Sequence, residues 1–157
     1  MQHWLFKSEP ETFSIDDLSK RPKQTEHWDG VRNYQARNML RDAIKKGDQG
    51  FFYHSSCEIP GIVGIFEVVK EGYGDHSALD PESTYFDPES TSANPRWYMV
   101  DIKLVKKFPC IITLQEIKQH PKLSEMLITR KGNRLSITPV TTKEWQTILH
   151  LAENNKA

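Results

Sequence analysis

The stretch Trp97-Tyr-Met-Val-Asp-Ile-Lys-Leu-Val-Lys-Lys107 alternates between two kinds of side chain. The apolar set consists of Tyr98, Val100, Ile102 and Leu104. The charged set consists of Asp101, Lys103 and Lys107. A period of two is typical of an antiparallel strand that has one face on the core and the other in solvent. This stretch therefore predicts a half-buried antiparallel strand around which the rest of the fold is arranged.

Further strand-like runs lie on both sides of this stretch. Residues 51–56 and 62–70 are rich in aromatic and β-branched side chains, and Pro60-Gly61 marks a turn between them. Residues 3–6 and 135–138 have the character of short strands. Short strands interleaved with short helices favour an α+β fold around a curved sheet or a small barrel.

Helix starts are marked by hydroxyl residues followed by acids. Ser14 with Asp17 predicts a helix that runs to about residue 20. The sequences 113–116 and 141–144 are capping boxes for two further helices. A fourth helix begins near Asn33, and Gly47 is a natural stop for it. Its apolar face comprises Ala36, Met39, Leu40, Ala43 and Ile44, and its opposite face Tyr34, Arg37, Asn38, Arg41 and Lys45.

The chain of 157 residues has the size of one domain, and no repeat or linker divides it, so we expect a single domain over residues 1–157. Lys plus Arg and Asp plus Glu both number 21, which gives a formal net charge of zero. This balance argues against a polybasic protein that binds nucleic acid without sequence specificity. The hydrophobic fraction of 37% argues against a disordered chain.

Targeting and membrane signals are not evident in the sequence. The longest apolar stretch, residues 61–69, is shorter than the roughly 20 residues that cross a bilayer. The first residues lack the pattern of a signal peptide. We therefore expect a cytoplasmic protein with no membrane partner, nuclear if it comes from a eukaryote. Cys57 and Cys110 are expected to be free thiols, buried or half-buried.

Residues 72–95 form an unusual segment. It contains the tetrapeptide Asp-Pro-Glu-Ser twice, at 80–83 and 87–90, and has little apolar periodicity. Long loops inside a domain are usually functional or act as a cover. Asp75, His76, Asp80 and Asp87 lie in it without a regular ligand spacing, so the acids are interpreted as turn and cap residues.

Signatures of catalysis and of cofactors are weak. The sequence contains no phosphate-binding glycine loop, no His-Glu-x-x-His and no Cys-x-x-Cys, so we predict no catalytic residues, no cofactor and no metal site. His54, Ser55, Ser56 and Cys57 follow one another at a strand end. Neighbouring side chains on an extended segment alternate between faces, so this group is interpreted as a polar strand end rather than a nucleophilic site.

The informative region is Trp28-Asp-Gly-Val-Arg-Asn-Tyr-Gln-Ala-Arg37. A nucleobase needs an aromatic face for stacking and amide groups for its edge, which Trp28, Tyr34 and Asn33 offer. Phosphates need cations, which Arg32, Arg37 and Arg41 supply. The alternative is that Trp28 belongs to the core, Asn33 caps the helix, and the arginines form a solvated face. Both interpretations stay open at this point.

Several blocks resemble the EVE domain family. They are 4–10 (Trp-Leu-Phe-Lys-Ser-Glu-Pro), 28–38, 51–55 (Phe-Phe-Tyr-His-Ser), 60–64 (Pro-Gly-Ile-Val-Gly), 95–97 (Pro-Arg-Trp), 132–136 and 139–141. The resemblance implies a PUA-like fold, that is, a small mixed or antiparallel β-barrel flanked by short helices. It also implies binding of DNA or RNA through a pocket for a flipped, modified base, either a modified cytosine or a modified adenine.

Carried onto this sequence, the resemblance implies two sets of residues. The expected base pocket comprises Lys7, Ser8, Trp28, Val31, Asn33, Tyr34, Tyr53, His54, Ser55 and Trp97. The expected phosphate contacts are Arg32, Arg37, Arg96, Arg130 and Arg134.

The function that we expect is non-catalytic binding of nucleic acid that contains a modified base. Two alternatives remain. One is a small hydrolase or amidohydrolase that acts on modified nucleosides, with His54, Lys7 or Cys57 as reactive groups. The other is a module that binds a peptide or a small acid.

Overall fold

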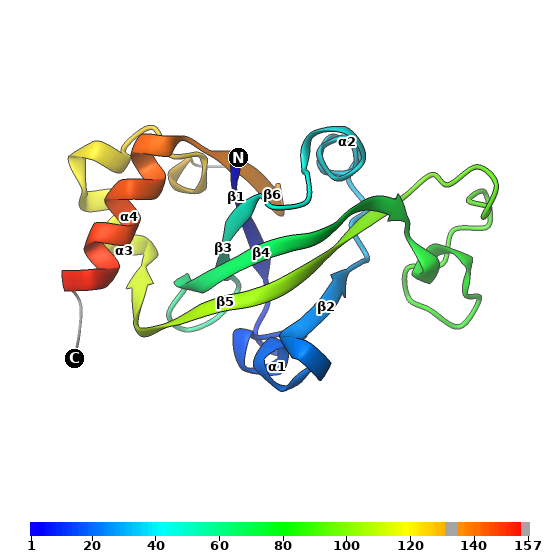
Figure 1. Cartoon of the computed structure of the whole chain (residues 1–157), viewed down its shortest axis with the longest axis horizontal. Helices are drawn as coiled ribbons and strands as arrows, with labels where there is room; N and C mark the ends of the chain where they lie inside the picture. Colours follow the sequence, from blue (N-terminus) through cyan, green and yellow to red (C-terminus); the bar gives the residue numbers. More distant parts are fainter. Residues whose placement is uncertain (131–134, 155–157) are drawn as a thin grey trace.

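The computed structural model describes residues 1–130 and 135–154, and a long antiparallel pair of strands runs through its centre. These strands are β4 (Gly61–Gly74) and β5 (Tyr98–Thr113), drawn in green in Figure 1. β5 contains the alternating stretch 98–107 and continues past it to Thr113. Phe108 and Ile112, in this continuation, are also buried. The predicted antiparallel strand is confirmed and is longer than expected.

Four shorter strands complete a six-stranded sheet in the order β2-β5-β4-β3-β1-β6. They are β1 (His3–Ser8), β2 (Thr25–Trp28), β3 (Gln49–His54) and β6 (Ile137–Val140). β1 and β3 are parallel, and the other pairs are antiparallel. The predicted α+β class with a mixed sheet is confirmed.

The closed barrel that we expected is not formed by the described residues. The edge strands β2 and β6 pair only with β5 and β1, respectively, so the sheet stays open. Closure of a barrel requires the two edge strands to pair with each other, and β2 and β6 do not pair among the described residues. The sheet is therefore a curved, mixed sheet with helices around it rather than a barrel.

Both faces of the sheet are buried, because neighbouring side chains on one strand enter different cores. On β1, Trp4 and Phe6 join one cluster and Leu5 joins the other. The first cluster also takes residues from α1 (Ile15–Lys20) and α2 (Tyr34–Asn38). The second takes residues from α3 (Leu114–Gln119) and α4 (Thr142–Asn154). In Figure 1, α3 and α4 lie at one end of the molecule, and the loop after β4 lies at the other.

The predicted helix starts are confirmed. The hydroxyl oxygens of Ser14 and Thr113 accept hydrogen bonds from backbone N–H groups in a capping box, and Thr141 does so with Glu144. The helix predicted from Asn33 is α2, followed by a π turn, η2 (Met39–Ala43), which ends before Gly47 at φ 95°. The shorter 3₁₀ turns are η1 (Pro22–Gln24), η3 (His76–Leu79), η4 (Pro121–Leu123) and η5 (Leu127–Thr129).

The segment between β4 and β5 is held in shape by its own acids. The Oδ1 atoms of Asp75, Asp80 and Asp87 accept hydrogen bonds from backbone N–H groups two residues further on, at 2.8, 2.9 and 3.0 Å. The interpretation of these acids as turn and cap residues is confirmed. Cys57 and Cys110 are half-buried free thiols, as expected. Within residues 1–130 and 135–154, no helix combines the length and the apolar character of a membrane span.

Candidate functional site

An open cleft of about 570 Å³ lies beside β1, β2 and the start of the connection to α2. We call it the main cleft. Its lining consists of Lys7, Ser8, Glu9, Thr12, Phe13, Arg21, Glu26, His27, Trp28, Asp29, Gly30, Val31, Arg32, Tyr85 and Ser136. Its volume is within the range of about 300–1,000 Å³ that small-molecule sites occupy. Of the predicted pocket residues, it brings together Lys7, Ser8, Trp28 and Val31.

Asp75 connects the two segments that form one end of the main cleft. Its Oδ2 atom accepts hydrogen bonds from Gly30 N at 2.8 Å and from Arg32 Nη1 at 3.0 Å. Its Oδ1 atom accepts from Ser77 N and Ser77 Oγ at 2.8 and 2.6 Å. Burial of this carboxyl acts to raise its pKa, but the hydrogen bonds from Ser77, Gly30 and Arg32 outweigh it and lower the pKa. The charged carboxylate therefore fixes residues 30–32 against the loop.

Tyr85, from the loop after β4, closes over Gly30. Gly30 has φ 77°, and a Cβ atom placed on it would meet the ring of Tyr85 at 2.7 Å. The carbonyl of Tyr85 accepts hydrogen bonds from Arg32 Nε and Nη2 at 3.2 and 2.6 Å. Glycine is needed here both for the left-handed backbone and for the close approach of the ring. The segment 72–95 thus supplies part of the wall, in line with a covering role.

Trp28 belongs both to the core and to the cleft wall. Its side chain is 8% exposed, and its ring contacts Phe6 and Phe52 with centroids 5.2 and 5.6 Å apart. Phe13 contacts it edge to face at 6.3 Å and also lines the cleft. The exposed remainder of Trp28 and the half-buried Phe13 give the cleft an aromatic side.

Polar groups face this aromatic side. Burial lowers the pKa of the Lys7 ammonium group, and burial together with nearby Asp75 raises the pKa of Asp29. Ser8 Oγ donates a hydrogen bond to the carbonyl of Phe13 at 2.7 Å, so its lone pairs remain acceptors. An aromatic surface with donors and acceptors around it suits a flat, polar ligand.

Tyr34 and Trp97 lie outside the main cleft, in a stack of aromatic and cationic side chains. Their rings are stacked with centroids 4.9 Å apart and an interplanar angle of 20°. Arg37 lies over the Tyr34 ring at 4.9 Å, and Arg32 lies over the Trp97 ring at 5.2 Å. The Tyr34 side chain is 53% exposed, which leaves much of it available to solvent. We call these four residues the aromatic stack.

The predicted phosphate contacts differ in how their charge is balanced. Arg32 pairs with Asp75, Arg96 pairs with Asp87 and Glu89, and Arg130 pairs with Glu125. Arg37 instead donates to two neutral oxygen atoms. Its Nε atom donates to the side-chain Oδ1 of Asn38 and its Nη1 atom to the backbone carbonyl of Arg96, both at 2.9 Å. Arg134 lies outside the described residues. Among the predicted arginines that the structure describes, Arg37 has the least compensated charge.

The remaining predicted residues lie apart from the main cleft. Tyr53 and Ser55 line a second cleft of about 590 Å³, together with Lys7, Lys118 and Arg130. Burial raises the pKa of Tyr53 to about 12, so its phenol is neutral. Asn33 Oδ1 caps α2 by accepting from Ala36 N at 3.0 Å, as the alternative interpretation held. His54 Nε2 accepts from Ile15 N at 3.1 Å at the start of α1.

The sequence profile of the EVE domain matches residues 2–151. The chain belongs to the EVE domain family. The resemblance inferred from the sequence blocks is thereby confirmed.

Proteins and solved structures similar to this EVE domain match nearly the whole chain. Thymocyte nuclear protein 1 from Homo sapiens is 46% identical over an alignment of 169 positions, which spans 96% of this chain and 74% of that protein. A crystal structure of human THYN1 protein in complex with 5-methylcytosine-containing DNA is 45% identical, with a TM-score of 0.91 over 98% of both chains. A crystal structure from Pseudomonas putida is 47% identical, with a TM-score of 0.90 over 96% of this chain and 99% of that one.

Several residues of the EVE domain cleft were not expected from the sequence. The cleft is also lined by five residues that were not predicted as pocket residues: Phe13, Glu26, His27, Asp29 and Tyr85. Of these, only Asp29 lies in one of the sequence blocks that resemble the EVE domain family. Residues 25–28 form the edge strand β2. They follow a polar segment that contains Pro22 and show no alternation of apolar and polar side chains, so the sequence did not mark them as a strand. The Asp-Gly dipeptide at 29–30 was a usable signal, because it places a carboxylate next to a backbone that only glycine adopts readily.

Proposed function

We propose that this EVE domain binds nucleic acid that contains a modified base, with a modified cytosine as the first candidate, and that it does not change the base chemically. The supporting observation is its likeness over nearly the whole chain to the human THYN1 protein, whose structure is a complex with 5-methylcytosine-containing DNA. The main cleft offers the features that such a ligand requires. The relatives named thymocyte nuclear protein 1 favour a nuclear location if the source is a eukaryote.

In this proposal a flipped base enters the main cleft. Extruding a base costs a few kcal/mol, and stacking on aromatic side chains such as Trp28 and Phe13 returns about 1–3 kcal/mol per base. A cytosine edge carries an amino donor and ring acceptors. The carboxylate of Asp29 is an acceptor for the amino group, and the ammonium group of Lys7 is a donor for the ring acceptors.

The affinity for the nucleic-acid backbone is expected to be low. Most of the predicted arginines are already paired with carboxylates, and the whole chain has no net charge. Backbone affinity comes mostly from phosphates that are neutralised by cations, so few new pairs are available. The selectivity for a modified base then depends on the cleft.

The direct experiment compares two oligonucleotides that differ only in one 5-methylcytosine, in both DNA and RNA, by fluorescence anisotropy at fixed salt. An otherwise identical pair with a methylated adenine shows which base is preferred. The proposal predicts tighter binding of a modified oligonucleotide. Equal affinity for the modified and unmodified members of every pair contradicts it.

The variants Lys7→Gln and Lys118→Gln locate the bound base. Lys7 lines both clefts, whereas Lys118 lines only the second one. Loss of preference in Lys7→Gln with no change in Lys118→Gln supports the main cleft. An equal loss in both variants assigns the base to the second cleft.

Absence of catalysis is tested by incubating the protein with modified nucleosides and oligonucleotides and measuring their masses. Unchanged masses agree with the proposal. Turnover that disappears in Lys7→Gln favours the hydrolase alternative. His54 is a poor candidate for that chemistry, because its Nε2 lone pair already accepts from Ile15 N.

A further inference from the structure

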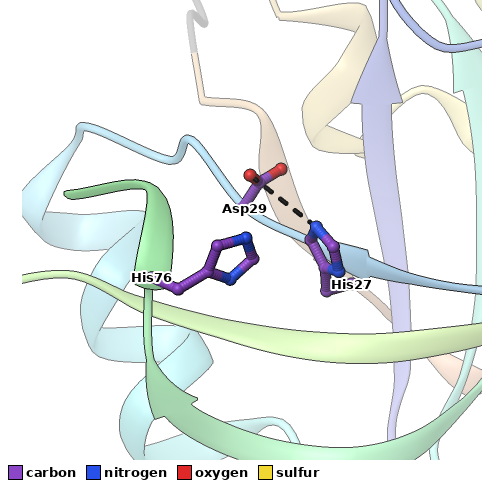
Figure 2. A group of neighbouring side chains, drawn as sticks. All are labelled: His27, Asp29 and His76. Carbon is purple, nitrogen blue, oxygen red and sulfur yellow. Dashed lines mark ion pairs between the residues drawn. The ribbon is translucent and has the colours of Figure 1, made fainter. Parts of the chain in front are cut away.

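Two imidazoles and a carboxylate come together at one border of the main cleft. His27 is on β2, Asp29 follows that strand, and His76 opens η3, which is separated from them by almost 50 residues of sequence. One ligand atom from each of the three residues lies within 4.8 Å of the others. Figure 2 shows the three side chains pointing toward a common space, with the ion pair between His27 and Asp29 drawn as a dashed line.

We propose that His27, Asp29 and His76 bind a divalent transition-metal ion, for which Zn²⁺ is the probe. Imidazole and carboxylate are ligands that zinc accepts together, in sites that keep a further position for water or another ligand. This inference is independent of the proposed function. His27 and Asp29 also line the main cleft, so the ion would border whatever is bound there.

The distances leave a small adjustment to be made. His27 Nε2 lies 3.9 Å from Asp29 Oδ2, and the rings of His27 and His76 have centroids 4.5 Å apart at an interplanar angle of 83°. Zinc bonds of about 2.0–2.1 Å place tetrahedral ligands roughly 3.4 Å apart. His76 is exposed, and within the described residues its imidazole makes no hydrogen bond, so it is able to rotate toward the other two ligands.

The orientation of His27 is already suited to metal binding. Its Nδ1 atom lies 3.0 Å from Oε1 of Glu26, while its Nε2 atom faces Asp29. A carboxylate beside one ring nitrogen favours the tautomer that carries its proton there, which leaves the lone pair of the other nitrogen for a metal ion. Glu26 is itself held by Arg21 Nε, which donates to its Oε2 atom at 2.6 Å.

The backbone on which two of the ligands stand is also fixed. Gly30 N donates to Asp75 Oδ2 at 2.8 Å, so the residues that precede Gly30 and follow Asp75 are neighbours. Those residues are Asp29 and His76. The buried carboxylate of Asp75, already paired with Arg32, therefore positions two ligands without being one of them. A site whose backbone is fixed in this way loses less conformational entropy when the ion binds.

The test uses untagged protein, because a histidine tag would bind the same ions. Protein freed of metal with a chelator is titrated with Zn²⁺ by calorimetry, without nucleic acid. We expect one ion per chain and a loss of affinity of about 10-fold or more in His76→Ala, the ligand variant least able to disturb folding. Glu26→Gln is expected to weaken binding by about 10-fold, although Glu26 is not a ligand.

His150→Ala is the matched control, because His150 is an exposed histidine on α4, outside the cluster. Its affinity for Zn²⁺ is expected to equal that of the unchanged protein. The imidazole nitrogen resonances of His27 and His76 should shift together as Zn²⁺ is added. The proposal is overturned if the unchanged protein binds no Zn²⁺, if His76→Ala binds as tightly as the unchanged protein, or if His150→Ala loses as much affinity.

Failure of this proposal is distinguishable from failure of the proposed function. The metal titration contains no nucleic acid, and the oligonucleotide measurements can be made in the presence of chelator. Selective binding of a modified oligonucleotide in chelator, without Zn²⁺ binding in the titration, would contradict the metal site alone.

Discussion

Arg32 Nη1 lies 3.0 Å from Oδ2 of Asp75, and the Asp75 side chain is fully buried whereas that of Arg32 is 23% exposed. Asp75→Asn removes the charge but nearly keeps the shape, and it leaves the guanidinium group without its carboxylate. We expect the free energy of unfolding to fall by about 2–4 kcal/mol, because the loss of one partner leaves the other charge poorly compensated. Urea unfolding followed by circular dichroism measures this change.

Asp42→Asn is the matched control for that variant. Asp42 also pairs with an arginine, Arg41, at 2.8 Å, but both side chains are exposed. Exposed ion pairs contribute little to stability, so the unfolding curve is expected to stay nearly unchanged. Similar losses in the two variants would show that burial of Asp75 is not what makes its pair important.

Trp28 is expected to affect base selectivity and stability to different degrees in two variants. Trp28→Ala empties a core position between Phe6 and Phe52, so we expect a loss of about 3–5 kcal/mol in unfolding free energy. Trp28→Phe keeps an aromatic side chain in the core and reduces the surface offered to a base. Its preference for 5-methylcytosine in anisotropy measurements should decrease while the protein stays folded. An unchanged preference in folded Trp28→Phe would contradict stacking on this indole.

His54 should make stability depend on pH. Burial lowers its pKa from the ordinary 6.5, so the unfolded chain takes up the proton at a higher pH than the folded protein does. The free energy of unfolding therefore decreases as the pH falls through about 6.5 toward the lower folded value. A protonated Nε2 atom can no longer accept the hydrogen bond from Ile15 N.

His54→Gln separates this effect from that of the other histidines. Its amide oxygen is an acceptor that does not titrate. Urea unfolding at about pH 7.5 and about pH 5.5, on either side of the ordinary histidine pKa of ~6.5, should show a smaller loss of stability for the variant than for the unchanged protein. Burial also lowers the pKa of His3, which contributes to both proteins alike. Equal losses in the two proteins would rule out a contribution from His54.

Arg37 is expected to carry more of the salt dependence of DNA binding than Arg96. Arg37 donates only to neutral acceptors in the described structure, whereas Arg96 already pairs with Asp87 and Glu89. Each phosphate that a cation neutralises adds about 0.9 to the slope of log affinity against log salt for duplex DNA. Arg37→Gln should lower the slope by about that amount, and Arg96→Gln by less. A larger reduction in Arg96→Gln would contradict this assignment.

The local parts of the fold could be predicted because their signals are local. Ser14, Thr113 and Thr141 mark helix starts, because their side chains accept hydrogen bonds from the backbone N–H groups three residues further on. The alternation of apolar and charged side chains in residues 98–107 is enough by itself to predict a strand. The edge strand β2 escaped prediction because residues 25–28 have no such pattern and become a strand only by pairing with β5. Closure into a barrel depends on contacts between distant strands, which no local pattern reports.

The site was harder to predict because its residues meet through pairings across the sheet. Lys7 and Tyr53 are direct neighbours in the parallel register of β1 and β3, yet Lys7 lines both clefts and Tyr53 only the second one. A sequence block places such residues on one list without saying which cavity each one faces. His27 and His76 meet because the hydrogen bond between Gly30 and Asp75 holds their two segments together, and their positions in the sequence gave no clue to that bond.

The parallel pairing of β1 with β3 couples ligand binding to the integrity of the sheet. Parallel strands cannot be joined by a hairpin, so a long connection, residues 9–48, leads from β1 to β3 through α1, the edge strand β2 and α2. Residues 28–32 of the main cleft lie on this connection. Ordering so long a connection opposes folding. An occupied cleft would hold the connection in its native shape and add its binding free energy to the stability of the whole protein. Backbone amides of Phe6 and Phe52, deep in the sheet, would then exchange with deuterium more slowly when the ligand is bound.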